Sequence, residues 1–138
     1  MTISFVLPVG AFSINRMSSR DLRFKTPAYK DFATQVLYVL EQVDALKVMG
    51  ELHAAKGGEF TVELTATYPP QLFRNKQGEI SSRSIDCSNF EKPILDLIFG
   101  DTMGVNDRHV TCLISKKRAG ARLSIECTIS LISPISSC

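Results

Sequence analysis

The alternation of apolar and polar residues along this chain predicts its strands. In residues 59–68, EFTVELTATY, every second residue is apolar, which is typical of a strand with one buried face and one face in water. The apolar set of this strand is Phe60, Val62, Leu64 and Ala66. Similar short runs, rich in β-branched residues, predict three more strands, at residues 2–7, 109–116 and 122–131.

Apolar residues that recur at steps of three and four predict two helices. We expect the first to begin with Thr26 as its cap and Pro27 in its first position, and to end near Leu46. Its buried stripe comprises Tyr29, Phe32, Ala33, Val36, Leu40 and Val43. The second helix covers roughly residues 90–99, and its apolar residues are Phe90, Ile94, Leu95, Leu97 and Ile98.

These elements follow one another in the order β-α-β-loop-α-β-β. They predict one α/β (α+β) domain over residues 1–138, with a small mixed sheet flanked by helices. The tetrapeptide KRAG, residues 117–120, looks like the turn of a hairpin that joins the last two strands. Residues 71–84 contain a turn at Gly78 and show no period, so we expect a mobile basic loop there.

The overall charge is only slightly basic. The 16 Lys and Arg residues exceed the 14 Asp and Glu residues by two, which by itself argues weakly for a nucleic-acid partner. The basic residues gather in two groups, the first made of Arg74, Lys76 and Arg83 and the second of Lys116, Lys117, Arg118 and Arg122. Each group could contact DNA phosphates or could be a solvated loop, and the sequence leaves both interpretations open.

The cysteines and histidines do not form a metal-binding motif. No two of the four cysteines have C-x-x-C spacing, and His53 and His109 stand alone, which argues against a zinc site. No apolar run reaches the length of a membrane span, and the first residues lack the basic start of a signal peptide. We therefore expect a reducing, cytoplasmic protein with free thiols and no membrane contact, in which Cys112 and Cys127 pack as core residues.

The start of the second helix has an ordinary structural explanation. Ser88 and Glu91 fit a capping box, and Asp86 would complement the positive end of the helix dipole. Pro93 disturbs this pattern because proline has no amide hydrogen, so the helix starts a residue or two later or opens with an irregular turn. Lys92 would lie in the first turn, where its charge is unfavourable by roughly 0.3–1 kcal/mol.

Two further acids near this helix also have simple explanations when each is taken singly. Asp96 follows Lys92 by four residues, a spacing at which surface ion pairs are common on helices. Asp107 follows Asn106, and Asn-Asp is ordinary turn chemistry before a strand.

Taken together, these residues resemble the RusA family of Holliday-junction resolvases. The chain reads Asp86-x-Ser88-Asn89-x-x-Lys92-x-x-x-Asp96, then Gly104-Val105-Asn106-Asp107, then two strands. The family carries D-x-D-N-x-x-K-x-x-x-D, followed by a segment that ends in D-D before the next strand. The opening LPVGAFSINR is also similar to the start of the family, and Asn15 would be its asparagine. The specific motif spans residues 86–107, whereas the order of elements is similar over nearly the whole chain.

The resemblance implies a homodimeric endonuclease that cuts four-way DNA junctions with magnesium, or manganese in its place. Asp86 and Asp107 would hold the metal, with Ser88 as a neutral third ligand, and Lys92 would stabilise charge at the scissile phosphate. The supporting residues would be Asn15, Asn89, Asp96 and Asn106. The side chains that would contact DNA phosphates are Arg74, Lys76, Arg83, Lys116, Lys117 and Arg118.

The chain departs from the family pattern at two acids. Ser88 stands at one aspartate position and Asn106 at another, which removes two negative charges from the implied site. An alternative function is therefore a RusA-like protein with weakened or lost catalysis that binds branched DNA without cutting it. A third is a small protein-interaction domain in which the acids serve only as caps and turns.

Overall fold

The computed structural model describes residues 1–7, 27–81 and 87–133, with the backbone alone for residues 27–29 and 87–90. The strands are β1 (Thr2–Leu7), β2 (Glu59–Tyr68), β3 (Val110–Ala119) and β4 (Ser124–Ile132). The α-helices are α2 (Pro27–Glu41), α3 (Asp44–Lys56), α4 (Pro70–Phe73) and α5 (Cys87–Leu95). A π-helical segment, η2 (Asp96–Met103), continues α5, and a short 3-10 turn, η3 (Asp107–His109), precedes β3.

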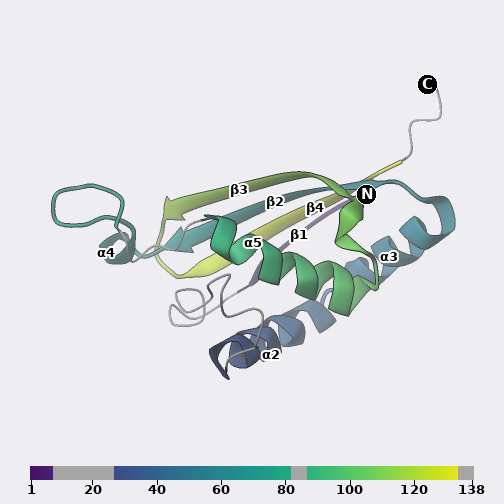
Figure 1. Ribbon diagram of the computed structural model, residues 1–138, viewed down its shortest axis with the longest axis horizontal. Helices are drawn as coiled ribbons and strands as arrows, with labels where there is room; N and C mark the ends of the chain where they lie inside the picture. The colour runs from purple at the N-terminus through teal and green to yellow at the C-terminus, as the bar shows by residue number, and fades with distance from the viewer. Residues whose placement is uncertain (8–26, 82–86, 134–138) are drawn as a thin grey trace.

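The four strands form one mixed sheet in the order β1-β4-β2-β3. β2 and β3 are parallel, whereas β4 lies antiparallel to both β1 and β2. Helices α2, α3 and α5 lie on one side of this sheet (Figure 1). The predicted α/β domain with a small mixed sheet flanked by helices is therefore confirmed.

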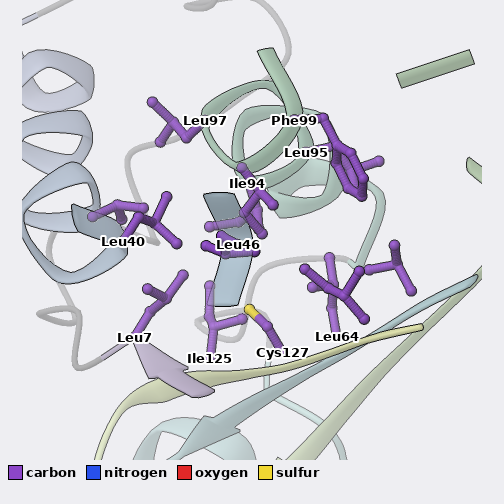
Figure 2. Packing of buried hydrophobic residues seen from close by; sticks show 14 of the residues in the cluster. Leu7, Leu40, Leu46, Leu64, Ile94, Leu95, Leu97, Phe99, Ile125 and Cys127 are labelled. Carbon is purple, nitrogen blue, oxygen red and sulfur yellow. The ribbon is translucent and has the colours of Figure 1, made fainter. Parts of the chain in front are cut away.

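The core lies between the helices and one face of the sheet. The alternation predicted for β2 is confirmed, because its four apolar residues are at most 2% exposed and face the helices. Figure 2 shows the packing of Leu7, Ile125 and Cys127 from the sheet against Leu40 and Ile94 from the helices. Fully burying an aliphatic side chain contributes about 1.5–3 kcal/mol to the free energy of unfolding, so this layer fixes how the helices sit on the sheet.

The first predicted helix is two helices. α2 ends at Glu41, and Val43 has a non-helical backbone before α3 begins at Asp44. The prediction of one helix to Leu46 is wrong because Leu40, Val43 and Leu46 keep a three-residue spacing across the break. Beyond Leu46, α3 buries only Met49 and Gly50, so its weak apolar stripe did not indicate a separate helix.

The predicted hairpin between the last two strands is also wrong. β2 lies between β3 and β4, and the connection crosses the end of β2, where the amide of Gly120 donates to the carbonyl of Tyr68 over 2.8 Å. Alternation predicts that a segment is a strand but not which strand it pairs with. As a consequence, Lys117 and Arg118 belong to β3 and not to a turn.

One of the two expectations for the cysteines is wrong, and the segment after β2 contains an unexpected helix. Cys112 was expected in the core, but it is exposed on the edge strand β3, whereas Cys127 is buried as expected. Residues 71–81 contain the turn expected at Gly78, here closed over residues 74–80, and the end of α4, which was not expected. In that turn the backbones of Arg74 and Ile80 form an isolated antiparallel β-bridge. The side-chain oxygen of Asn75 accepts hydrogen bonds from the amides of Gln77 and Glu79. This turn extends beyond α4 at one end of the molecule (Figure 1).

Within the part of the chain that is described, no helix has the length and apolar character needed to cross a membrane.

Candidate functional site

Lys92 joins two carboxylates that belong to different elements. Its ammonium nitrogen lies 2.7 Å from Oδ1 of Asp96 and 2.8 Å from Oδ2 of Asp107. The three side chains are between 33% and 58% exposed, so the cluster is open to solvent on one side. We call Lys92, Asp96 and Asp107 the lysine–aspartate cluster. The structure thus brings together three of the residues that the sequence motif singled out.

Helix α5 presents Lys92 differently from the sequence expectation. The helix begins at Cys87, so Ser88 lies inside its first turn and is not the residue before the helix that a capping box requires. Lys92 is consequently in the second turn, away from the free amides of the helix start. Pro93 lies inside the helix and is buried together with Ile94, which fixes the exposed direction of Lys92.

A wide helical segment carries Asp96 and leads the chain toward Asp107. η2 follows α5 without a break at Leu95, and the Thr102 hydroxyl donates to the Leu97 carbonyl over 2.8 Å. π-helical turns are rare and occur mostly as short insertions, often at functional sites. Proline removes one α-helical hydrogen bond, so Pro93 weakens the regular pattern just before η2 begins.

The end of η2 sets the position of Asp107. Gly104 adopts a left-handed backbone with φ 69°, which glycine tolerates without cost, and it reverses the chain. Val105 is buried, and its amide donates to the Phe99 carbonyl over 2.8 Å. Asn106 then caps η3, because its side-chain oxygen accepts from the Arg108 amide over 2.8 Å. The structure thus shows Asn106 as the cap of the turn that carries Asp107.

The electrostatics of the cluster keep Lys92 charged. The hydrogen bond to Asp107 raises the pKa of the Lys92 ammonium well above its ordinary value, and the hydrogen bond to Asp96 raises it further. Lys92 therefore cannot serve as a general base near neutral pH. It can stabilise negative charge, as an ammonium does next to a phosphate.

The cluster has donors of the kind that magnesium prefers. Mg²⁺ binds carboxylate oxygens and keeps several waters, and here two carboxylates already surround one positive charge with solvent access. Asp86 lies outside the described residues, as do the side chains of Ser88 and Asn89, although both of these lie in the backbone of α5. Among the described side chains, no three or more histidine, cysteine or acidic residues gather as a metal-ligand group.

His53 and His109 are neighbours in space, contrary to the expectation that they stand alone. Their ring centres lie 4.5 Å apart edge to face, and the centre of the His53 ring also lies 5.1 Å from that of Phe60, with the two rings tilted. This contact ties η3, which carries Asp107, to α3. Partial burial lowers the pKa of His109, and the nearby His53 and Arg108 lower it further. The sequence did not reveal this pair because no local pattern predicts that α3 and the turn before β3 lie side by side.

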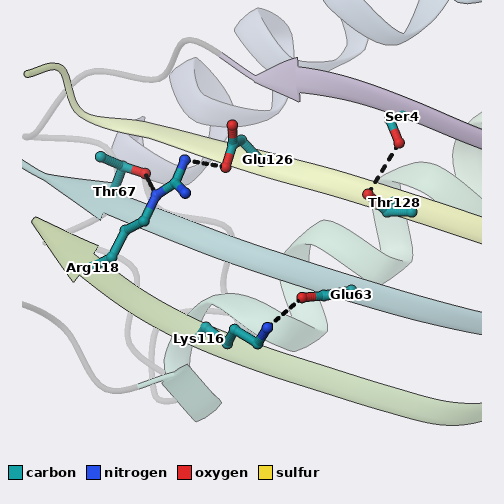
Figure 3. Close-up of polar contacts among 7 residues, drawn as sticks. All are labelled: Ser4, Glu63, Thr67, Lys116, Arg118, Glu126 and Thr128. Carbon is teal, nitrogen blue, oxygen red and sulfur yellow. Dashed lines mark hydrogen bonds and ion pairs between the residues drawn. The ribbon is translucent and has the colours of Figure 1, made fainter. Parts of the chain in front are cut away.

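The predicted DNA-binding residues fall into different environments. On the sheet face opposite the helices, Lys116 pairs with Glu63 at 2.7 Å, and Arg118 bonds Thr67 and Glu126 (Figure 3). The alternation of β3 directs Lys117 to the other face.

Two residues of the first basic group, Arg74 and Lys76, lie on the closed turn. Arg74 donates to the Gly78 carbonyl over 3.0 Å, and its guanidinium lies 5.2 Å from the centre of the Phe73 ring. Lys76 is exposed in the same turn, which leaves its charge available to a partner. Arg83 and Asn15 lie outside the described residues.

A scan against protein-family models and a search of curated proteins both find no match to this chain.

Proposed function

We propose that this protein is a magnesium-dependent endonuclease of the RusA type that nicks four-way DNA junctions. The observation that carries the proposal is the hydrogen bond between Lys92 and Asp107, which are 15 residues apart in the chain. The resemblance implies that this lysine and this acid serve one site, and their contact supports that implication.

The chemistry of phosphodiester hydrolysis matches the types of residue in the cluster. Asp107 would hold Mg²⁺ together with Asp86, and the ion would supply charge neutralisation and an activated water when bound. Lys92 would place its ammonium on a non-bridging phosphate oxygen and stabilise the charge that grows during attack. Asp96 would restrain that ammonium from the next helical turn, since it lies 2.7 Å away. Asp96 is thus a positioning residue.

The proposed substrate also needs positive charge away from the cluster. Lys76 and Arg74 would contact phosphates from the closed turn, a mode of binding that orients DNA without reading its sequence. A two-fold homodimer would place two sites on the two symmetric strands of a junction, which paired nicking requires.

A nicking assay tests the proposal. A synthetic four-way junction with one labelled strand is incubated with the protein at a concentration above its Kd for the junction. The reaction is run with magnesium and with a chelator, beside a linear duplex of the same sequence. We expect nicks near the branch point only with magnesium and only in the junction. Junction left intact by folded protein in magnesium would overturn the proposal.

One observation favours a second candidate, a branched-DNA-binding protein that does not cut. Asn106 stands where the family has an acid, and its side-chain oxygen accepts the cap hydrogen bond of η3. The site therefore has fewer anionic donors than the family pattern. Junction binding that weakens steeply with salt, without any nicking, would select this candidate.

A further inference from the structure

We infer that Lys92 is a resident cation that competes directly with the metal ion for Asp107. The inference rests on the proposed function, because it concerns the same carboxylate. It goes beyond that function by assigning Lys92 a second role, the control of metal affinity before DNA arrives.

The first step concerns the oxygen that the metal needs. Oδ2 of Asp107 accepts from the Lys92 ammonium over 2.8 Å, a distance typical of a charge-assisted hydrogen bond. An ion that used this oxygen would have to displace the ammonium or sit next to it. Two cations at such close range repel each other, so displacement is the favourable course.

The second step concerns where the ammonium goes when it leaves Asp107. Asp96 lies 2.7 Å from the same nitrogen and four residues further along the helix, so it can hold Lys92 alone. The lysine side chain is 58% exposed, and exposed ion pairs of this kind are weak. The exchange therefore requires only a rotation of one surface side chain, without a change in the fold.

The third step concerns DNA. A phosphate oxygen that reached the cluster would offer Lys92 a partner in place of Asp107. The same ammonium that hinders the metal without DNA would then serve the phosphate. Release of Asp107 in this way makes the metal site strongest when substrate is present, and by linkage the metal and the phosphate favour each other's binding.

Titration with Mn²⁺ tests the competition without relying on cleavage. The electron paramagnetic resonance signal of free Mn²⁺ reports binding to the wild type, Lys92→Met and Asp107→Asn in the absence of DNA. Arg108→Met is the matched control, because it also removes one positive charge next to Asp107. We expect Lys92→Met to bind Mn²⁺ roughly three- to fivefold more tightly, the upper part of the range that loss of an exposed ion pair allows. Arg108→Met should change the affinity less than about twofold, since screened charges act weakly.

The outcomes separate the competition between Lys92 and the metal from the existence of a metal site at Asp107. Equal tightening by Lys92→Met and Arg108→Met would mean a general charge effect and would overturn the competition. Unchanged affinity in Lys92→Met, with binding that still depends on Asp107, would overturn it while leaving the metal site of the proposed function in place. Mn²⁺ binding that does not depend on Asp107 in any variant would overturn both. Lys92→Gln, with circular dichroism of each variant, guards against misfolding of Lys92→Met.

Discussion

The ammonium of Lys92 and the carboxylate of Asp107 lie 2.8 Å apart although the two residues belong to separate elements. Helix α5 fixes the lysine, and the capped turn η3 fixes the acid. A surface ion pair between flexible side chains contributes little to stability, typically about 0–1 kcal/mol. The pair therefore contributes little to the free energy of unfolding, and we propose that its role lies in the candidate site.

Lys92→Ala should separate catalysis from binding. If the ammonium stabilises the transition state, single-turnover cleavage of a junction should slow by about 10²-fold, the usual effect of removing one preorganised donor. Junction affinity should fall only modestly, because one phosphate contact among many is lost. Lys92→Arg should rescue poorly, since a planar guanidinium does not replace a compact ammonium. A cleavage rate for Lys92→Ala within about threefold of wild type would leave Lys92 as a surface residue, because catalytic donors cost far more.

Restoring the acids of the family motif should strengthen metal binding. Asn106→Asp keeps an oxygen that can accept from the Arg108 amide, so the cap and the free energy of unfolding should change little. It also adds a negative charge next to Asp107. We expect Asn106→Asp, and likewise Ser88→Asp, to lower the magnesium concentration at half-maximal cleavage. A magnesium titration identical to that of the wild type would place the new carboxylate away from the metal.

The two basic groups should differ in their contribution to DNA binding. Lys76 is exposed on the closed turn, whereas Lys116 is paired with Glu63 at 2.7 Å. Lys76→Ala should therefore reduce the slope of log affinity against log salt concentration by about 1, and Lys116→Ala by clearly less. Fluorescence anisotropy of a labelled junction over a salt series measures both slopes. The opposite ranking would place the DNA on the open face of the sheet.

The buried thiol of Cys127 should make stability fall at high pH. Burial raises its pKa from the ordinary value of 9.0 to about 12. A raised pKa means that the folded state keeps a proton which the unfolded state releases, so the stabilisation is complete below pH 9.0 and is lost as the pH rises toward about 12. Urea unfolding should show an added slope of at most about 1.4 kcal/mol per pH unit relative to Cys127→Ala. Parallel pH profiles for the two chains would contradict the burial of a neutral thiol.

The strands and the core could be predicted because their signals are local. Alternation in β2 reports directly which side chains face the helices, and Phe60 and Leu64 are buried as the pattern indicates. The placement of β2 between β3 and β4 could not be predicted, since it depends on pairing between distant segments. The break before Asp44 was hidden for a related reason, because Leu40 and Leu46 continue one apolar stripe across it.

The candidate site could be predicted only as a set of residues. The motif spacing singled out Lys92, Asp96 and Asp107, but the geometry that unites them depends on features without a clear signal. These are the early start of α5 at Cys87, the π-helical turns after Pro93 and the left-handed Gly104. The contact of His53 with His109 likewise depends on how α3 packs beside β2, which sequence periodicity does not report.

The central claim is that Asp107 belongs to a metal-dependent nuclease site, and single-turnover cleavage by Asp107→Asn tests it most directly. The isosteric amide should keep the fold and the cap at Asn106 while removing the negative charge that the metal requires. We predict no cleavage of a four-way junction in magnesium, with junction affinity equal to or greater than that of the wild type, and the same result for Asp86→Asn. Cleavage by folded Asp107→Asn at the wild-type rate would show that Asp107 is only a turn residue, and the proposed site would be wrong.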